Sequence, residues 1–136
     1  MAGSFALEII TPEQVVFRGE VESLVAPAAE GYLGVLPRHA PLLAGLAVGE
    51  ARVKSGGEER SFAVAGGFLE VRREGVTLLP DTAEPAGRID AARAEAARAR
   101  AERRLAERAA DTNIARAEAA LRKAINRLRV AAGGRG

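Results

Sequence analysis

The side chains that most often carry catalysis are scarce in this chain of 136 residues. It has no cysteine, and His39 is its single histidine. One histidine without cysteine cannot supply a three-ligand zinc site or a typical pairing of nucleophile and base. The pattern G-x-x-x-x-G-K-S/T, whose backbone cradles phosphate groups, is also missing from the sequence. We therefore expect no catalytic residue, no metal ligand and no required cofactor, and any bound nucleotide would be sensed rather than hydrolysed.

The charged residues divide the chain into two parts. Residues 1–87 hold 7 Lys and Arg against 12 Asp and Glu, whereas residues 88–136 hold 13 against 6. The first part can bury a modest core, but the second part, which is rich in Ala and Arg, cannot bury one alone. Residues 80–87 are expected to form a linker, because Pro85 and Gly87 oppose a helix there. This division favours an anchored domain over 1–87 and a mobile basic arm over 88–136.

Nothing in the sequence predicts a membrane anchor. Residues 1–5 do not begin a charged segment followed by an apolar run, as a signal peptide would. No stretch approaches the roughly 18 consecutive apolar residues that span a bilayer. We expect no direct membrane insertion, so that any link to a membrane would go through a partner.

Short apolar runs separated by turn residues predict about eight to ten strands, a pattern typical of a β-sandwich. The expected strands are 5–10, 15–17, 21–25, 32–36, 42–48, 51–54, 60–64, 68–71 and 76–79. Turns are expected at 18–20 and at 55–58, where paired glycines supply the positive φ that a hairpin needs. Pro27 is expected to end its strand. The alternation in 68–71 predicts one buried face and one exposed face.

The second part of the chain predicts two helices. Asp90 is a good N-cap, and residues 91–110 contain no Gly, Pro or β-branched residue. Residues 111–113 interrupt this run with side chains that bond to nearby backbone, and a second helical run covers 114–130. We expect the tail beyond Gly133 to fray. A connection this short makes the helices antiparallel neighbours. The predicted fold class is therefore α+β, with an N-terminal β-sandwich followed by a C-terminal two-helix hairpin.

Small side chains line the predicted contact between the two helices. The apolar stripes are Ala94, Ala97, Ala101 and Leu105 on the first helix, and Ile114, Ala117, Leu121, Ala124 and Leu128 on the second. A buried methylene contributes about 0.8 kcal/mol, so an alanine seam holds the hairpin closed only weakly. Alanine also keeps each helix fairly stable by itself. We expect the hairpin to open without melting of its helices.

Three stretches match the pattern of one known family. Residues 30–42 resemble the signature E-G-x-L-G-x-x-P-x-H-x-P-L, and residues 66–71 with 76–79 resemble G-G-F-x-E-V and V-T-x-L. Residues 89–94 resemble I/L-D-x-x-R-A. Together, in order and over residues 4–131, they resemble the epsilon subunits of bacterial F-type ATP synthase, which are called delta in mitochondria.

The resemblance implies a β-sandwich of about ten strands, a helical hairpin and a place at the foot of the central rotor stalk. The implied partners are the gamma subunit, the c-ring of the membrane sector and, when the hairpin is raised, the alpha and beta subunits. The implied role is to couple proton-driven rotation to ATP synthesis and to inhibit ATP hydrolysis through the hairpin. The subunit would be peripheral, at the cytoplasmic face of the cell membrane, and non-catalytic.

In several relatives the I/L-D-x-x-R-A motif marks a regulatory ATP site that holds the hairpin down. Carried over by position, the candidates are Glu84, Ile89, Asp90, Arg93, Ala94, Arg100, Lys123 and Arg127. The resemblance makes Arg100, Lys123 and Arg127 the phosphate ligands, while Asp90 would meet the base or ribose or orient Arg93. ATP-binding relatives have Arg where this chain has Lys123, and Lys lacks the bidentate fork of Arg. The alternatives are a plain N-cap for Asp90 and solvated arginines.

The resemblance also places the loop before Leu42 near the gamma and c-ring contacts. The candidates for this rotor contact are Glu30, Tyr32, Arg38 and His39. Tyr32 lies where some relatives have Glu, so an aromatic contact would replace a polar one. The alternative for His39 is a residue that only packs the turn between Pro37 and Pro41.

Two other functions remain open from the sequence. A basic helical arm on a small β-domain also suits a nucleic-acid-binding protein. However, the arm interleaves Glu95, Glu102, Glu107 and Glu118 with its arginines, and no aromatic residue that could stack on bases follows Phe68. The second is an assembly factor or stalk adaptor without inhibition. Deletion of 88–136 distinguishes an adaptor from an inhibitor. An adaptor would keep its role, whereas the loss of an inhibitor would release ATP hydrolysis.

Overall fold

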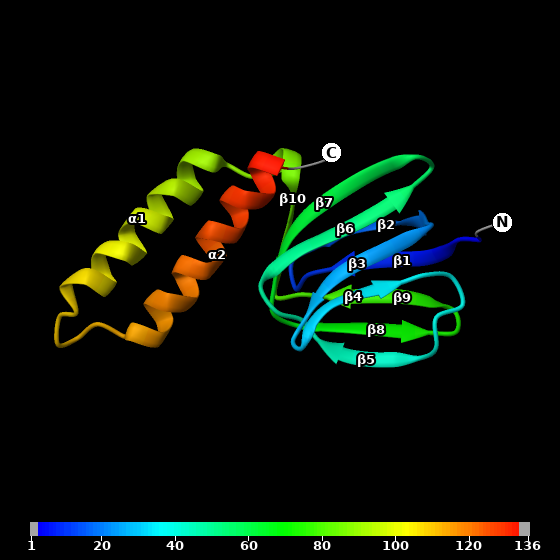
Figure 1. Cartoon of the computed structure of the whole chain (residues 1–136), viewed down its shortest axis with the longest axis horizontal. Coiled ribbons are helices and arrows are strands. Elements are labelled where there is room, and N and C mark those ends of the chain that lie inside the picture. The colour runs from blue at the N-terminus through cyan, green and yellow to red at the C-terminus, as the bar shows by residue number, and fades with distance from the viewer. Residues whose placement is uncertain (1–2, 134–136) are drawn as a thin grey trace.

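The computed structural model describes residues 3–133 and contains ten strands followed by a 3-10 turn and two helices (Figure 1). The strands are β1 (Phe5–Ile10), β2 (Val15–Val21), β3 (Ser23–Ala28), β4 (Gly31–Val35), β5 (Leu42–Gly45), β6 (Gly49–Ser55), β7 (Glu58–Ala65), β8 (Phe68–Arg72), β9 (Gly75–Leu79) and β10 (Thr82–Pro85). The helical elements are η1 (Ala86–Arg88), α1 (Ala91–Glu107) and α2 (Ile114–Gly133). The predicted fraying beyond Gly133 concerns residues outside the described range.

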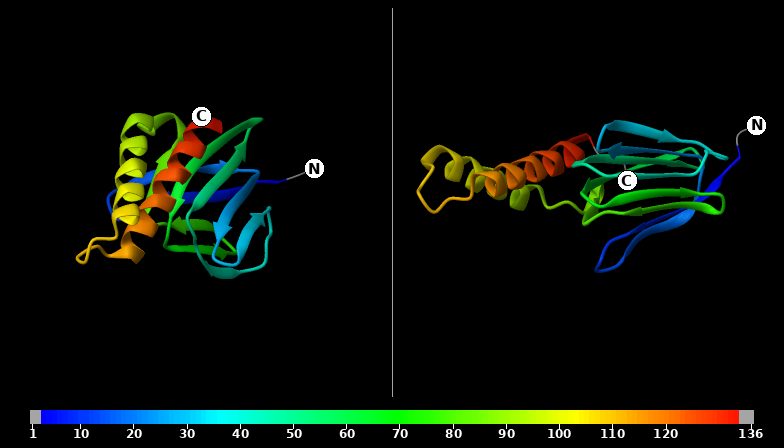
Figure 2. Two further views of the ribbon diagram at one scale, coloured as in Figure 1. Left: turned by 60° about the vertical axis from the view of Figure 1, so that its left-hand side comes forward. Right: turned by 90° about the horizontal axis from the view of Figure 1, so that it is seen from below.

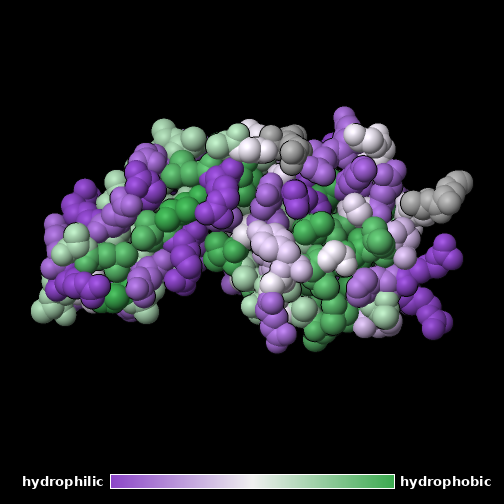
Figure 3. Space-filling model, viewed as in Figure 1, coloured by the Kyte–Doolittle hydropathy of each residue, from purple (hydrophilic) through white to green (hydrophobic). Residues whose placement is uncertain are grey.

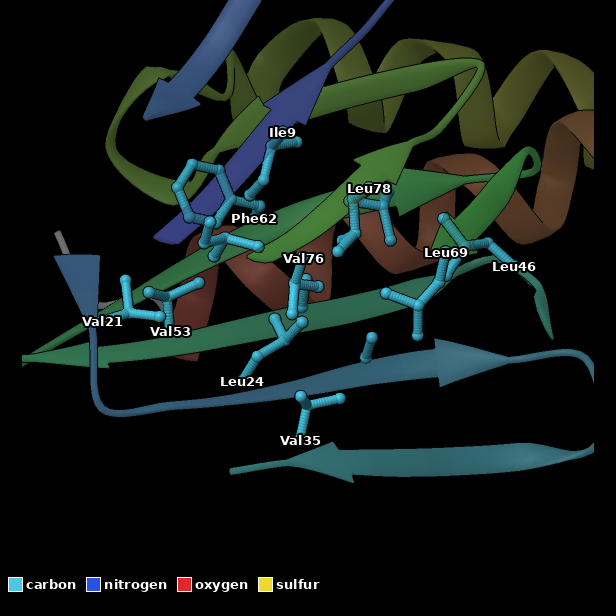
Figure 4. Packing of buried hydrophobic residues seen from close by; sticks show 14 of the residues in the cluster. Ile9, Val21, Leu24, Val35, Leu46, Val53, Phe62, Leu69, Val76 and Leu78 are labelled. Carbon is cyan, nitrogen blue, oxygen red and sulfur yellow. The ribbon is translucent and has the colours of Figure 1, made fainter. Parts of the chain in front are cut away.

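The strands form two five-stranded sheets, with the orders β2-β1-β9-β8-β5 and β10-β7-β6-β3-β4. Seen from below, the sheets are two layers with the helical hairpin projecting from one end (Figure 2). The core lies between the layers, where Leu69 and Leu78, paired side by side in one sheet, face the sheet that contributes Leu24 (Figure 4). In β8, Leu69 and Val71 are buried while Phe68 is exposed, as the alternation predicts. The predicted α+β class is confirmed.

The turn between β6 and β7 is formed by two glycines in the left-handed region. Gly56 and Gly57 have φ of 59° and 83°, and Ser55 pairs with Glu58 across the turn. A residue with a side chain is strained at two successive positive φ angles, whereas glycine is not. The prediction of a hairpin turn at 55–58 is confirmed.

The turn predicted at 18–20 is wrong, because β2 runs unbroken through these residues. Gly19 pairs with Leu7 of β1, and Arg18 forms an ion pair with Glu8 on the neighbouring strand. Pairing along the whole length of β1 outweighs the weak strand propensity of a single glycine.

Two strand ends also differ from the prediction. Pro27 does not end its strand but lies within β3, opposite Tyr32. Proline is tolerated there because β3 has already parted from β6, whose register with it ends at Arg52, so no N–H is needed on that side. The strand expected over 42–48 ends at Gly45, and β6 begins a few residues later.

The linker expected over 80–87 is largely structured. Residues 82–85 form β10, an edge strand antiparallel to β7, and η1 follows it directly. Pro85 sits at the end of an edge strand, where its missing N–H costs nothing. The sandwich is therefore tied to the arm by a paired strand rather than by a free segment.

The arm is an antiparallel helical hairpin, as predicted. The Arg93 N–H donates to Asp90 Oδ1 at 3.0 Å, which confirms Asp90 as the N-cap of α1. The helix ends at Glu107 instead of Ala110, because Arg108 adopts the left-handed conformation and closes the last turn. Asn113 Oδ1 accepts from the Arg116 N–H at 3.0 Å and so caps α2. All nine side chains of the predicted seam are buried or half-buried.

Candidate functional site

The junction between arm and sandwich is a small apolar contact at the C-terminal end of α2. Val130 of α2 packs with Ala63 of β7 and Ala86 of η1, and Ile89 covers the edge of this cluster. Val130 is 1% exposed, yet its partners are mostly alanine methyl groups. The rest of the hairpin points away from the sheets (Figure 1). Little apolar surface therefore holds the arm in place.

A buried hydrogen bond accompanies this contact. Asn126 Nδ2 donates to the carbonyl oxygen of Gly49 at 2.9 Å, and Asn126 is 6% exposed. Asn126 is not among the site residues expected from the sequence. The available signal was an amide with poor helix propensity inside a helix otherwise rich in Ala and Arg. Such a residue is best explained by a specific partner outside its helix.

An ion pair joins the same two parts of the chain. Arg127 Nε lies 2.8 Å from Glu84 Oε1, so it links α2 to β10. Both side chains are more than a third exposed, so the pair contributes between about 0 and 1 kcal/mol. Glu84 and Arg127 are both candidates for the ATP site, and the structure brings them together.

The other ATP-site candidates are distributed along the hairpin. Ile89 and Asp90 lie at the junction end, while Ala94 is buried in the helical seam. Arg93 is exposed on the first turn of α1, and Arg100 lies about 10 Å further along the same helix. Lys123 is exposed one turn before Arg127. The junction end thus gathers five candidates (Glu84, Ile89, Asp90, Arg93 and Arg127), whereas Arg100 stands apart from them.

Arg100 borders an open groove between α1 and α2. The groove has a volume of about 760 Å³ and is floored by Ala101 and Ala117 of the seam. Its charged lining residues are Arg100, Arg104, Glu107, Asp111 and Arg116. An anion in this groove would meet three guanidinium groups but also two carboxylates.

The strongest electrostatic cluster of the arm lies outside the predicted site. Arg98 bonds to Glu95 and to Glu102, with 2.8 Å between its Nη1 and Glu102 Oε1. The hydrogen bond from Arg98 lowers the pKa of Glu95 and, in turn, raises the pKa of Arg98. These i,i+3 and i,i+4 contacts brace one face of α1 rather than form a ligand site.

The four rotor-contact candidates do not form one cluster. Glu30 lies in the turn before β4, and Tyr32 is 61% exposed on that strand. Arg38 and His39 lie beyond the other end of β4, about 17 Å away. His39 Nδ1 donates to the Ala40 carbonyl at 2.7 Å. The candidates therefore border two separate parts of the surface.

Exposed apolar side chains form a further feature of the sandwich. Leu43, Phe68 and Leu79 are 68%, 57% and 45% exposed, and the register places Phe68 beside Leu79 on the outer face of their sheet. Hydrophobic residues also gather on the opposite side of the sandwich, which faces the viewer in Figure 3, over the part where β3 and β4 lie. Sequence reasoning missed this surface, because alternation shows which residues face outward but not that apolar ones meet there. Clustered apolar residues of this kind mark interaction surfaces.

Two structural features are absent from residues 3–133. No helix in this range is long and apolar enough to cross a membrane. Nor do three or more His, Asp or Glu side chains in the same range converge as a metal site would require.

Comparison with known families covers nearly the whole chain. Residues 4–86 match the family described as ATP synthase, Delta/Epsilon chain, beta-sandwich domain. Residues 88–132 match the family described as ATP synthase, Delta/Epsilon chain, long alpha-helix domain. These matches confirm the resemblance carried by the three sequence motifs.

Individual relatives agree with the family match. The ATP synthase epsilon chain of Desulforamulus reducens is 50% identical over 131 residues, which are 96% of this chain and 99% of the relative. That of Moorella thermoacetica is 53% identical over 130 residues, covering 94% and 96%. A chain of the mitochondrial ATP synthase of Euglena gracilis shares the fold, with a TM-score of 0.75 at 22% identity over 88% of this chain and 76% of that one. The chain belongs to the family of ATP synthase delta/epsilon chains.

Proposed function

We propose that this chain is a non-catalytic subunit of the central stalk of an F-type ATP synthase. It would bind the gamma subunit and the c-ring through the sandwich and couple proton-driven rotation to ATP synthesis. Family membership over both parts of the chain supports this role, as does the exposed apolar surface at Leu43, Phe68 and Leu79. The subunit would lie at the cytoplasmic face of the cell membrane without inserting into it.

We further propose that the arm rises along the gamma subunit and inhibits ATP hydrolysis. This proposal rests on one observation: the contacts between the arm and the sandwich are few and weak. One buried hydrogen bond contributes about 1 kcal/mol, and the half-exposed ion pair contributes about 1 kcal/mol at most. Burial of one valine adds about 1.5–3 kcal/mol. Docked and raised states that differ by so little can both be populated and can be shifted by a partner.

The charge of the arm suits its raised position. Residues 88–136 carry an excess of basic residues, which would be drawn to acidic segments of the alpha and beta subunits. The sandwich carries the opposite excess and would remain below, at the gamma and c-ring contacts. We assign Glu30, Tyr32, Arg38 and His39 to these contacts as a proposal, divided between the two ends of β4.

ATP is proposed as a ligand that holds the hairpin down. Bound phosphates would meet Arg100, Lys123 and Arg127, as the resemblance implies, and they would compete with Glu84, which forms an ion pair with Arg127. A ligand that bridges α1 and α2 binds the closed hairpin better than the open one, and only such a difference in affinity can shift the equilibrium.

Deletion of residues 88–136 in the assembled complex tests the inhibitory role. The core cluster of the sandwich draws only on residues between 5 and 83, so the remaining domain keeps its core. We expect the deletion to raise the rate of ATP hydrolysis while synthesis-coupled rotation persists. An unchanged rate of hydrolysis would identify the chain as a stalk adaptor without inhibition.

A further inference from the structure

One peptide group of the sandwich is held from both of its polar ends by side chains of distant elements. The Glu50 N–H donates to Tyr32 Oη of β4 at 3.1 Å. The Gly49 carbonyl, which belongs to the same peptide group, accepts from Asn126 Nδ2 of α2 at 2.9 Å. The hydroxyl of Tyr32 and the amide of Asn126 are therefore connected through a single rigid peptide plane.

The local strand pairing explains why a side chain occupies the N–H end. The register between β3 and β6 ends at Val25 and Arg52. Beyond that point Glu50 has no β3 residue opposite it in the ladder, and the phenol of Tyr32 takes the place of a carbonyl. A backbone N–H left without any partner would be costly, which makes this side-chain contact a required part of the local structure.

The packing around Gly49 leaves no room for a side chain at this position. A Cβ at this position would lie 2.6 Å from the Cβ of Pro27 and 2.8 Å from Tyr32 Oη, both closer than real contacts allow. Pro27 and Tyr32 face each other across β3 and β4. Tyr32 and Pro27 therefore lie against the residue whose carbonyl Asn126 must reach.

We propose that Tyr32 is a positioning residue for the docked arm, so that contacts made at Tyr32 and lifting of α2 are energetically coupled. A hydrogen bond at the N–H end of a peptide polarises its carbonyl and strengthens the next bond in the chain by roughly 10–30%. Such a coupling is reciprocal, because whatever holds Tyr32 in place favours the docked arm, and docking in turn holds Tyr32. This inference rests on the proposed function, in which the arm can leave the sandwich.

The two ends of this connection differ in their access to a partner. Tyr32 is 61% exposed and its O–H can still donate to a carboxylate or carbonyl of another subunit. Asn126 is 6% exposed and can be released only when α2 moves. A subunit that draws the Tyr32 ring away from Glu50 would therefore favour the raised arm without touching the arm itself.

The side-chain amide of Asn126 provides a direct measurement in the full chain. Gln14, Asn113 and Asn126 are the only side-chain amides, so an amide NMR spectrum contains three such groups and Asn126→Ala assigns the relevant one. We expect Tyr32→Phe to accelerate proton exchange of the Asn126 amide about 1.2- to 1.7-fold, because a hydrogen bond of about 1 kcal/mol would be weakened by about 10–30%. The amides of Gln14 and Asn113 would be unchanged and serve as internal references.

Ser55→Ala is the matched control. The Ser55 hydroxyl donates to the Glu20 carbonyl at 2.9 Å, at the opposite end of β6 from Gly49. Equal acceleration in this variant would mean general loosening of the sheet and would overturn the coupling. If the Asn126 amide is protected but exchanges at the same rate in Tyr32→Phe, the coupling would also be overturned, whereas the docked arm would stand. An unprotected Asn126 amide in the wild-type chain would overturn both the coupling and the docked arm.

Discussion

One buried hydroxyl in the sandwich lowers the stability of the fold. Ser61 is 1% exposed, and its Oγ has no hydrogen-bond partner among the described residues. It faces the same side of β7 as Ala63, on which α2 docks through Val130. An unsatisfied buried hydroxyl costs about 1–3 kcal/mol. We expect Ser61→Ala to raise the free energy of unfolding by about 1 kcal/mol, measured by denaturant titration of the full chain.

The same substitution elsewhere supplies the control for Ser61. Ser55→Ala removes a hydroxyl that does have a partner, so we expect it to lower the free energy of unfolding by about 0.5–1.5 kcal/mol. Two Ser→Ala variants with opposite signs would exclude a general effect of the substitution. A loss of stability in both would show that Ser61 has a partner in solution.

Residue roles that depend on local sequence were predictable, and those that depend on distant contacts were not. Asp90 could be recognised as an N-cap because its partner, the Arg93 N–H, is three residues away. Asn126 bonds to a carbonyl contributed by β6, and no local pattern encodes that distance. The ion pair of Glu84 with Arg127 lies between these cases, because both residues were candidates but their contact was not foreseen.

At the scale of elements, α1 carries a charged cluster that responds to pH. The hydrogen bond from Arg98 lowers the pKa of Glu95, so the carboxylate is favoured in the folded helix. A lowered pKa stabilises the helix above the usual pKa of Glu, and this contribution is lost as the pH falls through the folded value. We expect the titration midpoint of Glu95, followed by NMR, to rise in Arg98→Ala. Arg103→Ala, on the same helix, should leave it unchanged, and equal midpoints in all three chains would contradict the pairing.

The elements that sequence patterns identified share strong local signals. The helices were visible from long stretches without Gly, Pro or β-branched residues, and the hairpin at 55–58 from its paired glycines. The errors at 18–20 and 80–87 arose where pairing with a neighbouring strand decides the outcome. Residues 82–85 show no alternation, and only the edge of β7 makes them a strand. Such partners are set by the assembled sheet and not by the segment itself.

At the scale of the whole molecule, the sandwich buries far more apolar side chains in its core than the junction with the arm does. The sandwich contains one continuous core, whereas the arm is joined to it by a second cluster of three buried residues. The sandwich can therefore stay folded and attached to its partners while the arm changes position. A weak junction is the physical requirement for a switch, since a large apolar interface would fix the arm in one state.

The binding of ATP to the full chain tests how this switch is controlled. We expect titration calorimetry to show heat that saturates at millimolar ATP or below, as it would for a protein that senses cellular ATP. Asp90 caps α1, so Asp90→Ser is the suitable variant, because it removes the carboxylate and keeps a capping oxygen. It should weaken binding if Asp90 meets the ligand, and it should leave binding unchanged if Asp90 is only a cap.

Lys123 decides how tight that binding can be. A lysine meets phosphate as a point charge, whereas arginine can offer two parallel hydrogen bonds, which are each about twice as strong as neutral ones. We therefore expect Lys123→Arg to tighten ATP binding by roughly tenfold, since one added charge-assisted bond contributes about 1.5 kcal/mol. Arg122→Lys, the reverse change on the neighbouring exposed residue, should leave ATP binding unchanged. If neither the wild-type chain nor Lys123→Arg takes up ATP, the nucleotide has no part in holding the hairpin. The position of the arm would then depend on the junction at Asn126, Arg127 and Val130 and on the partners of the rotor alone.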